Sequence, residues 1–379
     1  MNKDYNPFIS LGYLDPEHFC DRETESKQLN QYLINGTNVT LFAIRRLGKT
    51  GLIHHVFYPY RKNKEINCIY LDILATNNLS EFTNQIATSV YNQFPLQNTL
   101  GKKIMGLFQR FRPVINFDEL SGKPSLSLTL ETQAQKEQTI GNILTFLDKQ
   151  GVKVIFAIDE FQQILEYPEK NKEAILRTCM QQLKNTSFIF CGSNQKMMHE
   201  IFNSAKRPFF ASCTNMQLNV INKKTYSQFI RKNFEANKRS ITQETIDFIC
   251  DWTKLHTFYT QHLCSTLFAQ HDKIITIKEA HQAALNVLKL NEPSFYQYKN
   301  LLTSGQWNLL CAIAKEEQVT QPQSKKFIAD HKLGTPSLVK RGLDALTTKE
   351  LIFFDSGVEK SYYEVYDKYL MRWIQNTQH

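Results

Sequence analysis

A glycine, a lysine and a hydroxyl follow one another at the end of the segment Ala43-Ile44-Arg45-Arg46-Leu47-Gly48-Lys49-Thr50. This spacing is close to the pattern Gly-x-x-x-x-Gly-Lys-[Ser/Thr], in which a turn between a strand and a helix holds phosphate groups. Backbone N–H groups and the positive end of the following helix attract the phosphate oxygens there. An apolar, β-rich run ends at Ile44 and a helical pattern begins near Lys49, so the segment has the context that this chemistry requires.

Each residue of this loop has an expected role. Gly48 allows close backbone approach, Lys49 bridges the β- and γ-phosphates, and the Thr50 hydroxyl binds Mg²⁺. The remaining phosphate contacts are expected from the loop and first helical turn: Arg45, Arg46, Leu47 and Gly51. The first glycine of the pattern is replaced by Ala43, which weakens the match but leaves Gly-Lys-Thr intact. The alternative is a chance Gly-Lys-Thr on a surface turn.

Two adjacent carboxylates, Asp159 and Glu160, follow the apolar run Val154–Ile158. With this strand beside the strand of the phosphate loop, Asp159 is expected to hold Mg²⁺ through water and Glu160 to polarise an attacking water. A solvated strand end is the alternative for either residue alone. The two motifs in their required contexts together predict a site for ATP and Mg²⁺.

A further apolar run, Ser187–Cys191, leads into Gly192-Ser193-Asn194. A polar side chain at that strand end is expected between the magnesium carboxylates and the γ-phosphate, where it would sense the nucleotide state. Asn194 is the first candidate for this role and Ser193 the second. Gly-Ser-Asn is also ordinary turn composition, which is an equally good reading.

The elements that must position these residues follow an α/β pattern between Val39 and Ile221. Short runs that are apolar on both faces alternate with stretches of helical periodicity, which predicts a parallel sheet covered by helices on both sides. The strands are expected at Val39–Ile44, Cys68–Ile73, Val154–Ile158 and Ser187–Cys191, and helices include Ser80–Phe94 and Lys170–Leu183. Alternation in Phe111–Phe117 and Ser125–Leu130, around the turn Asp118–Pro124, predicts an inserted β-hairpin near 111–130.

Helical periodicity dominates from Lys223 to about Leu290, and Glu292-Pro293 is expected to interrupt it. Three helices and two β-prone pieces split by Ser356-Gly357 then follow, which is the winged-helix pattern. We therefore predict an α/β phosphate-binding domain at 1–222, an all-helical lid at 223–290 and a winged helix-turn-helix domain at 291–379. The expected lid helices are Tyr226–Asn237, Thr242–Leu255, Tyr259–Gln270 and Ile277–Leu290, and the expected winged-helix elements are Ser304–Lys315, Ser324–His331, Pro336–Thr347, Leu351–Asp355 and Ser361–Val365.

Composition places the chain among ordinary globular proteins, with 42% hydrophobic and 21% charged residues over 379 positions. No basic-then-apolar leader and no long apolar run is present, so a cytoplasmic protein without a membrane span is expected. The eight cysteines form no Cys-x-x-Cys pair, which favours buried free thiols. The formal charge of +9 is concentrated in the middle of the chain, because residues 291–379 carry 11 basic against 10 acidic side chains.

Taken in order, these motifs resemble the archaeal-type ATPases of the STAND/AAA+ division of P-loop NTPases. The matching segments are Phe19–Glu25, Arg45–Thr50, Asp159-Glu160, Gly192-Ser193, Tyr363–Asp367 and Arg372–Ile374. The resemblance implies that the opening segment, with Arg22, lies against the adenine. It also implies a nucleotide sensor in the lid, where Leu255-His256-Thr257-Phe258-Tyr259 has Thr257 in place of the expected proline. His256 would contact phosphate there, although a packing role is the alternative.

An arginine from a neighbouring subunit is a further expectation for such a site. Arg207, in the segment after the third strand, is the first candidate and Arg177 the second. The alternative is that both are solvated or salt-bridged. If one acts on a neighbour, turnover requires a homo-oligomer.

The third winged-helix helix is expected to place Ser337, Lys340, Arg341 and Asp344 opposite Leu338, Leu343 and Leu346. Two basic residues on this face permit DNA binding, while Asp344 and the near-neutral module oppose it. A protein-docking or regulatory role is the other reading.

The leading hypothesis is an ATPase that uses Mg²⁺ and drives a lid and winged-helix switch. A slow or non-hydrolysing nucleotide-binding signalling scaffold and an ATP-gated DNA-binding protein are the alternatives.

Overall fold

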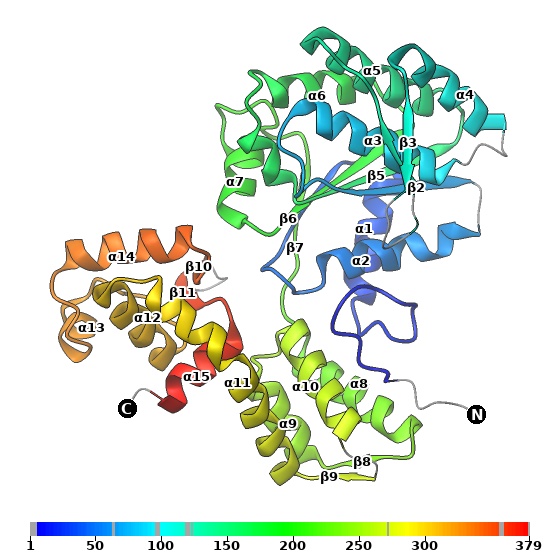
Figure 1. The fold of residues 1–379 in the computed structure, drawn as a ribbon. Helices are drawn as coiled ribbons and strands as arrows, with labels where there is room; N and C mark the ends of the chain where they lie inside the picture. The colour runs from blue at the N-terminus through cyan, green and yellow to red at the C-terminus, as the bar shows by residue number, and fades with distance from the viewer. Residues whose placement is uncertain are drawn as a thin grey trace. The chain divides into compact units, whose positions relative to one another are not determined.

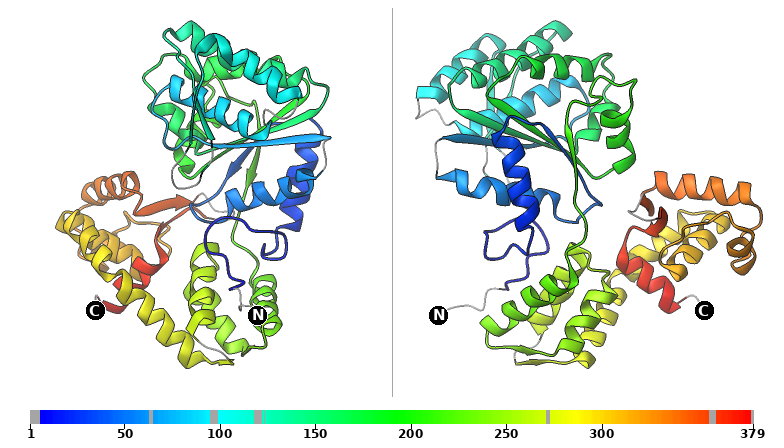
Figure 2. Two further views of the ribbon diagram at one scale, coloured as in Figure 1. Left: turned by 45° about the vertical axis from the view of Figure 1, so that its right-hand side comes forward. Right: turned by 180° about the vertical axis from the view of Figure 1, so that it is seen from behind.

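The computed structural model describes residues 6–62, 65–94, 99–117, 122, 124–270, 273–355 and 360–377. The chain divides into two compact units (Figures 1 and 2). One unit is Gly12–Val220, and the other combines residues up to Leu11 with those from Ile221 onward. The first unit is α/β and the second is mainly helical, as the sequence predicts.

A parallel five-stranded sheet with the order β2-β5-β6-β1-β7 forms the centre of the α/β unit. Every residue of β1 and β6 is buried, because helices cover both faces. The predicted fold class is thus confirmed. One detail of the prediction is wrong: β5 is not beside the phosphate-loop strand β1, because β6 lies between them. The strands are β1 Val39–Phe42, β2 Ile66–Asp72, β5 Lys153–Asp159, β6 Thr186–Gly192 and β7 Thr214–Gln217.

Alternate side chains of the strands enter two separate hydrophobic layers. Ile155 and Ala157 of β5 pack with α1 and α2, whereas Phe156 and Ile158 pack with helices α3 to α7. This period-two division is what a strand covered on both faces requires. The helices are α1 Glu23–Ile34, α2 Lys49–Phe57, α3 Leu79–Gln93, α4 Thr99–Phe108, α5 Gln133–Asp148, α6 Lys172–Gln181 and α7 Gln195–Asn203, with 3₁₀ turns η1 Tyr58–Arg61, η2 Gln109–Phe111 and η3 Phe161–Glu166.

The β-hairpin expected near 111–130 consists of β3 Val114–Phe117 and β4 Pro124–Ser127, paired antiparallel. It is shorter than predicted, because Leu128 and Leu130 leave the strand and enter the core beside α3 to α7. Most of the predicted turn Asp118–Pro124 lies outside the described residues.

The helical unit begins with four helices close to the predicted lid helices: α8 Lys223–Ala236, α9 Gln243–Trp252, α10 Thr257–Gln270 and α11 Ile277–Asn300. Short strands β8 Ser240–Ile241 and β9 Ile274–Ile275 pair between them. The predicted interruption at Glu292-Pro293 is wrong, since α11 continues through Pro293. Tertiary contacts hold its C-terminal half: the buried Phe295 ring lies 5.5 Å from that of Trp373, and Glu292 accepts a hydrogen bond from Trp373 Nε1 at 3.1 Å.

The winged-helix elements are α12 Ser304–Glu316, α13 Lys325–Asp330, α14 Pro336–Thr348, β10 Ile352–Asp355, β11 Tyr362–Val365 and α15 Lys368–Thr377. β10 and β11 pair antiparallel, as expected, and the predicted break at Ser356-Gly357 lies outside the described residues. On α14, Lys340 and Arg341 are exposed, but Leu338 was assigned to the wrong face and is 50% exposed. Val339 and Gly342 occupy the buried face instead, where Gly342 allows Leu309 of α12 to approach.

The start of the described chain packs into the helical unit. Asn6 Nδ2 donates to the Ser265 carbonyl at 3.0 Å, and the Phe8 ring lies 4.8 Å from that of Phe234. Phe8 also meets the rings of Phe229 and Phe268. The chain therefore passes between the two units twice, once near Gly12 and once near Val220. All eight cysteines are free thiols, as predicted, but only four are buried, since Cys68, Cys179, Cys213 and Cys311 are half-buried.

Candidate nucleotide-binding site

The loop between β1 and α2 bends back on itself around its lysine. Gly48 has φ 104° and Arg46 has φ 61°, so the turn uses left-handed backbone at two positions. Lys49 Nζ donates to the carbonyls of Ala43 at 3.2 Å and Ile44 at 3.4 Å, and the side chain is only 6% exposed. Burial lowers the pKa of Lys49, while the nearby carboxylates oppose that shift. An anion in the loop would add a charged partner to the two carbonyl oxygens that this buried ammonium group already contacts.

Asp159 is the centre of a hydrogen-bond network at the carboxyl end of the sheet. Its Oδ2 accepts from Thr50 Oγ1 at 2.7 Å and from Tyr70 Oη at 2.8 Å. Its Oδ1 accepts from Cys191 Sγ at 3.0 Å. Burial by itself would raise the pKa of Asp159, but these hydrogen bonds and the charge of Lys49 bring it below its usual value. Asp159 is therefore an anion next to the loop, although β6 separates the two strands.

Glu160 is held by the segment that follows β6. Its Oε2 accepts hydrogen bonds from Ser193 Oγ at 2.7 Å, from Ser193 N at 3.2 Å and from Gln162 Nε2. Glu160 itself has φ 54°, which turns the chain sharply into η3. A Cβ on Gly192 would lie 2.0 Å from Gln162 Oε1, so this position must be glycine for Gln162 to remain in place.

Asn194 and Ser193 have different surroundings. Asn194 caps α7, because its Oδ1 accepts from Met197 N at 3.1 Å. Ser193 contacts Glu160 directly. The sensing role of Asn194 stays a prediction. Its neighbour Ser193 makes the contact with Glu160, the candidate for activating the attacking water.

The other predicted phosphate-contacting residues fall into two groups. Arg45 and Arg46 are exposed on the loop, whereas Leu47 is buried. Gly51 lies on α2, where an added Cβ would come 3.3 Å from the Phe19 ring. The opening segment thus packs on α2 through Phe19, which stacks on His55 at 4.3 Å between ring centroids.

Arg22 is only 4% exposed and its guanidinium already has protein partners. Nη1 donates to Glu25 at 2.8 Å and Nη2 donates to the Asn219 carbonyl at 2.5 Å. These bonds tie the opening segment to the residues just before the end of the α/β unit. A direct contact between Arg22 and nucleotide remains a prediction.

The three remaining candidates lie in other local settings. Arg207 pairs with Glu173 at 2.9 Å and with Glu200, and its finger role stays a prediction. Arg177 lies half-buried on α6. His256 belongs to the helical unit, where it is 2% exposed and its ring lies 4.8 Å from that of Tyr259.

Sequence reasoning missed Tyr70, Cys191 and Gln162, which donate to the two carboxylates. Two of them were detectable in principle, because Tyr70 and Cys191 lie near the carboxyl ends of β2 and β6, and parallel strands present their carboxyl ends at one edge. Gln162 lies in η3, whose fold could not be foreseen. The oxygen atoms of Thr50 and Asp159 are 2.7 Å apart and are ligands of the kind that Mg²⁺ prefers, so the residues fit this ion.

This phosphate-loop architecture agrees with comparisons of the sequence. A family model described as an ATPase domain predominantly from Archaea matches residues 19–255, and a probable winged helix domain matches residues 293–376. The first match covers more than half of the chain. The protein therefore belongs to this family of ATPase domains and carries a C-terminal winged helix. No curated protein matches the sequence.

Solved structures share this fold over almost the whole chain. A Walker-type ATPase of Pyrococcus abyssi is 16% identical, with a TM-score of 0.67 over 97% of this chain and 99% of that one. The ORC2 protein of Aeropyrum pernix, in ADPNP-ADP complexes, is 13% identical, with a TM-score of 0.57 over 99% and 97%. The ORC1 protein of Aeropyrum pernix, in complex with DNA, is 10% identical, with a TM-score of 0.55 over 100% and 98%.

Helices that could cross a bilayer are absent from the part of the chain that the structure describes.

Proposed function

We propose that the protein binds ATP with Mg²⁺ at the loop between β1 and α2 and hydrolyses it. One observation carries the proposal: Thr50 Oγ1 and Asp159 Oδ2 lie 2.7 Å apart although 109 positions separate them in sequence. Lys49, the first residue of α2, is buried and its charge acts on Asp159. Bound Mg²⁺ would neutralise phosphate charge at this point. Membership of the ATPase family and the nucleotide complexes of the ORC2 neighbour support this reading.

In this proposal the protein residues bind and orient the reactants. Backbone N–H groups of the loop and the N-terminus of α2 hold the phosphates, and Lys49 balances their charge. Thr50 and Asp159 hold the metal ion. The carboxylate of Glu160 must first leave its hydrogen bonds with Ser193 and Gln162. It then orients the attacking water or accepts a proton from it.

Two substitutions test binding and turnover separately. Lys49→Ala should abolish the stabilisation that ATP gives in a thermal unfolding experiment, because the phosphates lose their main cation. Glu160→Gln should retain that stabilisation and lose steady-state phosphate release. Lys62→Ala and Glu166→Gln, at exposed positions, are the matched controls. An unchanged ATP shift in Lys49→Ala would refute the site itself.

A slow nucleotide-dependent scaffold is the second candidate. It is favoured by the two hydrogen bonds from Ser193 and the one from Gln162 that occupy Glu160 Oε2. It is also favoured by Arg207, whose guanidinium is bound to Glu173 and Glu200. Equal background rates for wild type and Glu160→Gln, with ATP binding retained, would select the scaffold.

The third candidate is an ATP-gated DNA-binding protein. Exposed Lys340 and Arg341 on α14 and the DNA complex of the ORC1 neighbour favour it, whereas exposed Asp344 opposes it. Fluorescence anisotropy of labelled duplex DNA at low salt, with and without ATP, tests this candidate. Binding that Lys340→Ala weakens would support it, and no binding at low salt would remove it. The alternative partner of this face is a protein.

We further propose the domain limits 1–222, 223–290 and 291–379, amended in that residues before Gly12 pack in the helical unit and α11 spans the boundary at 290. We also propose a place in the STAND/AAA+ division and a cytoplasmic location. A homo-oligomer follows if Arg207 or Arg177 acts on a neighbouring subunit. Lid closure on ATP, and resetting of the winged helix on hydrolysis, complete the proposed cycle.

A further inference from the structure

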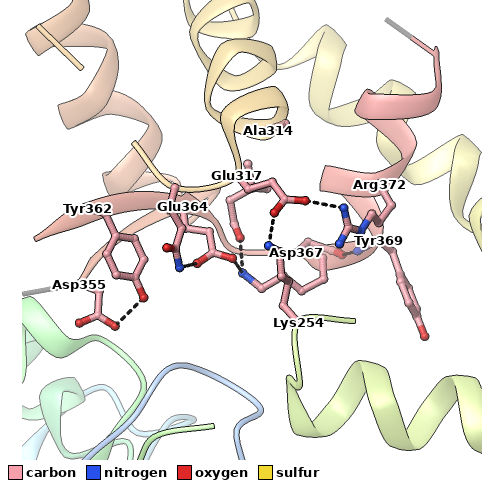
Figure 3. Close-up of polar contacts among 12 residues, drawn as sticks. Lys254, Ala314, Glu317, Asp355, Tyr362, Glu364, Asp367, Tyr369 and Arg372 are labelled. Carbon is pink, nitrogen blue, oxygen red and sulfur yellow. Dashed lines mark hydrogen bonds and ion pairs between the residues drawn. The ribbon is translucent and has the colours of Figure 1, made fainter. Parts of the chain in front are cut away.

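An ion-pair cluster in the helical unit joins a lid helix to two winged-helix helices (Figure 3). Arg372 lies on α15, Glu317 follows α12 and Lys254 follows α9. Arg372 Nη1 donates to Glu317 Oε1 at 2.6 Å, and Lys254 Nζ pairs with Glu317 Oε2. We call these residues the Lys254–Glu317–Arg372 cluster. One carboxylate thus bridges cations from the lid and from the C-terminal helix.

Arg372 also binds the end of α9 directly. Its Nε donates to the Trp252 carbonyl at 2.8 Å, and Nη2 donates to the Asp251 carbonyl at 3.0 Å. The last carbonyls of a helix have no partner within that helix, and a cation at this end also interacts well with the helix dipole. Arg372 is 14% exposed, so these charge-assisted bonds are only partly screened by solvent. A winged-helix side chain therefore supplies the C-terminal cap of a lid helix.

The backbone immediately after this cap is in an unfavourable conformation. Lys254 and Leu255 have φ 57° and 55°, which non-glycine residues usually avoid. His256 follows, and α10 begins at Thr257. Glu317 is also in a rare conformation, with φ 61° and ψ −58°, in a γ-turn closed by Gln318 N and Glu316 O at 2.7 Å. Such conformations persist only where surrounding contacts enforce them, and the cluster joins both segments.

A second set of contacts connects α15 to the lid. Tyr369 Oη lies 2.9 Å from His262 Nδ1 and 3.3 Å from the Tyr259 carbonyl, both on α10. The Tyr369 ring lies 5.6 Å from that of Trp252 on α9. Val287 and Leu288 of α11 share a hydrophobic core with the winged-helix residues. These contacts hold α9 and α10, the helices on either side of loop 253–256, against α15.

We propose that Arg372 and Glu317 are positioning residues that hold loop 253–256 and couple it to the winged helix. The coupling rests on the proposed function, in which ATP closes the lid that contains this loop. Arg372 binds the carbonyls of Asp251 and Trp252, just before this loop, and the carboxylate of Glu317. Glu317 in turn pairs with Lys254 of the loop, so a change in the loop alters the contacts of α15. The same coupling free energy acts in reverse, from the winged helix to the nucleotide site.

Hydrogen exchange measured on the full chain, with and without ATP, tests both parts of the proposal. In the nucleotide-free protein, Arg372→Ala should accelerate exchange in residues 249–260 by roughly tenfold or more, because the cap and the ion pair are lost. With ATP, wild type should change exchange in the lid and in residues 360–377, whereas Arg372→Ala should respond only in the lid. Lys289→Ala, at an exposed position on α11, should behave as wild type.

Two further variants separate positioning from general stability. Arg372→Lys retains the charge but cannot reach two carbonyls and a carboxylate together, so it should resemble Arg372→Ala. Glu317→Gln keeps the size of the side chain and should give an intermediate effect, and it serves if Arg372→Ala fails to fold.

Four results would overturn the proposal in distinguishable ways. Unchanged apo exchange in residues 249–260 of Arg372→Ala refutes the positioning role. A preserved winged-helix response to ATP in Arg372→Ala, or a wild type whose lid alone responds, refutes the coupling. If wild type does not bind ATP at all, the proposed function is wrong and the coupling, which rests on it, is overturned as well. Exchange in nucleotide-free wild type and Arg372→Ala still decides the positioning role.

Discussion

Glu160 and Asp159 are adjacent in sequence and have separate sets of donors. Asp159 receives side-chain hydrogen bonds from α2, β2 and β6, which fix its carboxylate beside the phosphate loop. Glu160 points to the segment after β6 and is held by Ser193 and Gln162. The fixed carboxylate of Asp159 suits a metal ligand. The carboxylate of Glu160, once released from its hydrogen bonds, suits a base that acts at only one stage of the reaction.

Gly192→Ala tests how closely this arrangement is packed. The added Cβ would lie 2.0 Å from Gln162 Oε1 and 2.8 Å from Met198 Sδ, so both side chains must move. We expect the free energy of unfolding to fall by about 1–3 kcal/mol, measured in urea. Displacement of Gln162 should also change the rate of phosphate release. The control is Gly106→Ala on α4, where an added Cβ meets no atom within 4 Å; an equal loss in both variants would contradict the packing explanation.

At the scale of elements, α11 illustrates how tertiary contacts overcome a local signal. Pro293 has no N–H to donate to the preceding turn, yet the helix continues to Asn300. Pro293→Ala should restore one backbone hydrogen bond and raise the free energy of unfolding by about 1–3 kcal/mol. Chemical denaturation of the full chain measures this change. Leu290→Ala, at a position 80% exposed on the same helix, should have little effect. A destabilised Pro293→Ala would show that the proline ring is needed for packing.

The Lys254–Glu317–Arg372 cluster predicts a pH dependence of the helical unit. Burial alone would raise the pKa of Glu317, but the hydrogen bonds and charges of Lys254 and Arg372 bring it below the ordinary value of 4.5. A carboxyl group with a lowered folded-state pKa stabilises the fold above its unfolded pKa. This contribution should be complete above about pH 5.5 and disappear as pH falls through the folded pKa, below about 4.5. His331 Nε2 lies 3.1 Å from Oε1 of the neighbouring Glu316.

Unfolding in urea at several pH values measures this contribution as the difference between wild type and Glu317→Gln. The difference should narrow as the pH falls below 4.5. A difference that is constant from neutral to acidic pH would show that the carboxylate charge contributes nothing.

For the whole molecule, the division of the cores predicts two unfolding transitions. Both hydrophobic clusters of the sheet lie inside Gly12–Val220, whereas Phe8 packs in the helical unit. Phe8→Ala should therefore lower the stability of the helical unit by about 3–5 kcal/mol and leave the α/β transition unchanged. Calorimetry of the variant checks this, with Leu11→Ala, at a position 74% exposed, as the control. A loss shared equally by both transitions would show that the units unfold together.

Much of the fold was predictable because the signals are local. The buried strands β5 and β6 are continuous apolar runs, and the four lid helices have clear helical periodicity. Leu338 was misplaced because an apolar side chain on a helix can face solvent when its neighbours Val339 and Gly342 fill the packed face. Pro293 was misjudged because the contacts that hold the rest of α11 come from distant parts of the chain.

The sequence by itself determined the phosphate loop, the two carboxylates and the division into α/β and helical parts, because each depends on a few adjacent residues and their periodicity. Only the tertiary structure decided that β6 lies between β1 and β5, that Ser193 and Gln162 hold Glu160, and that Arg372 caps α9. Strand order and long-range side-chain contacts depend on how separate elements pack, and no short stretch of sequence contains that information.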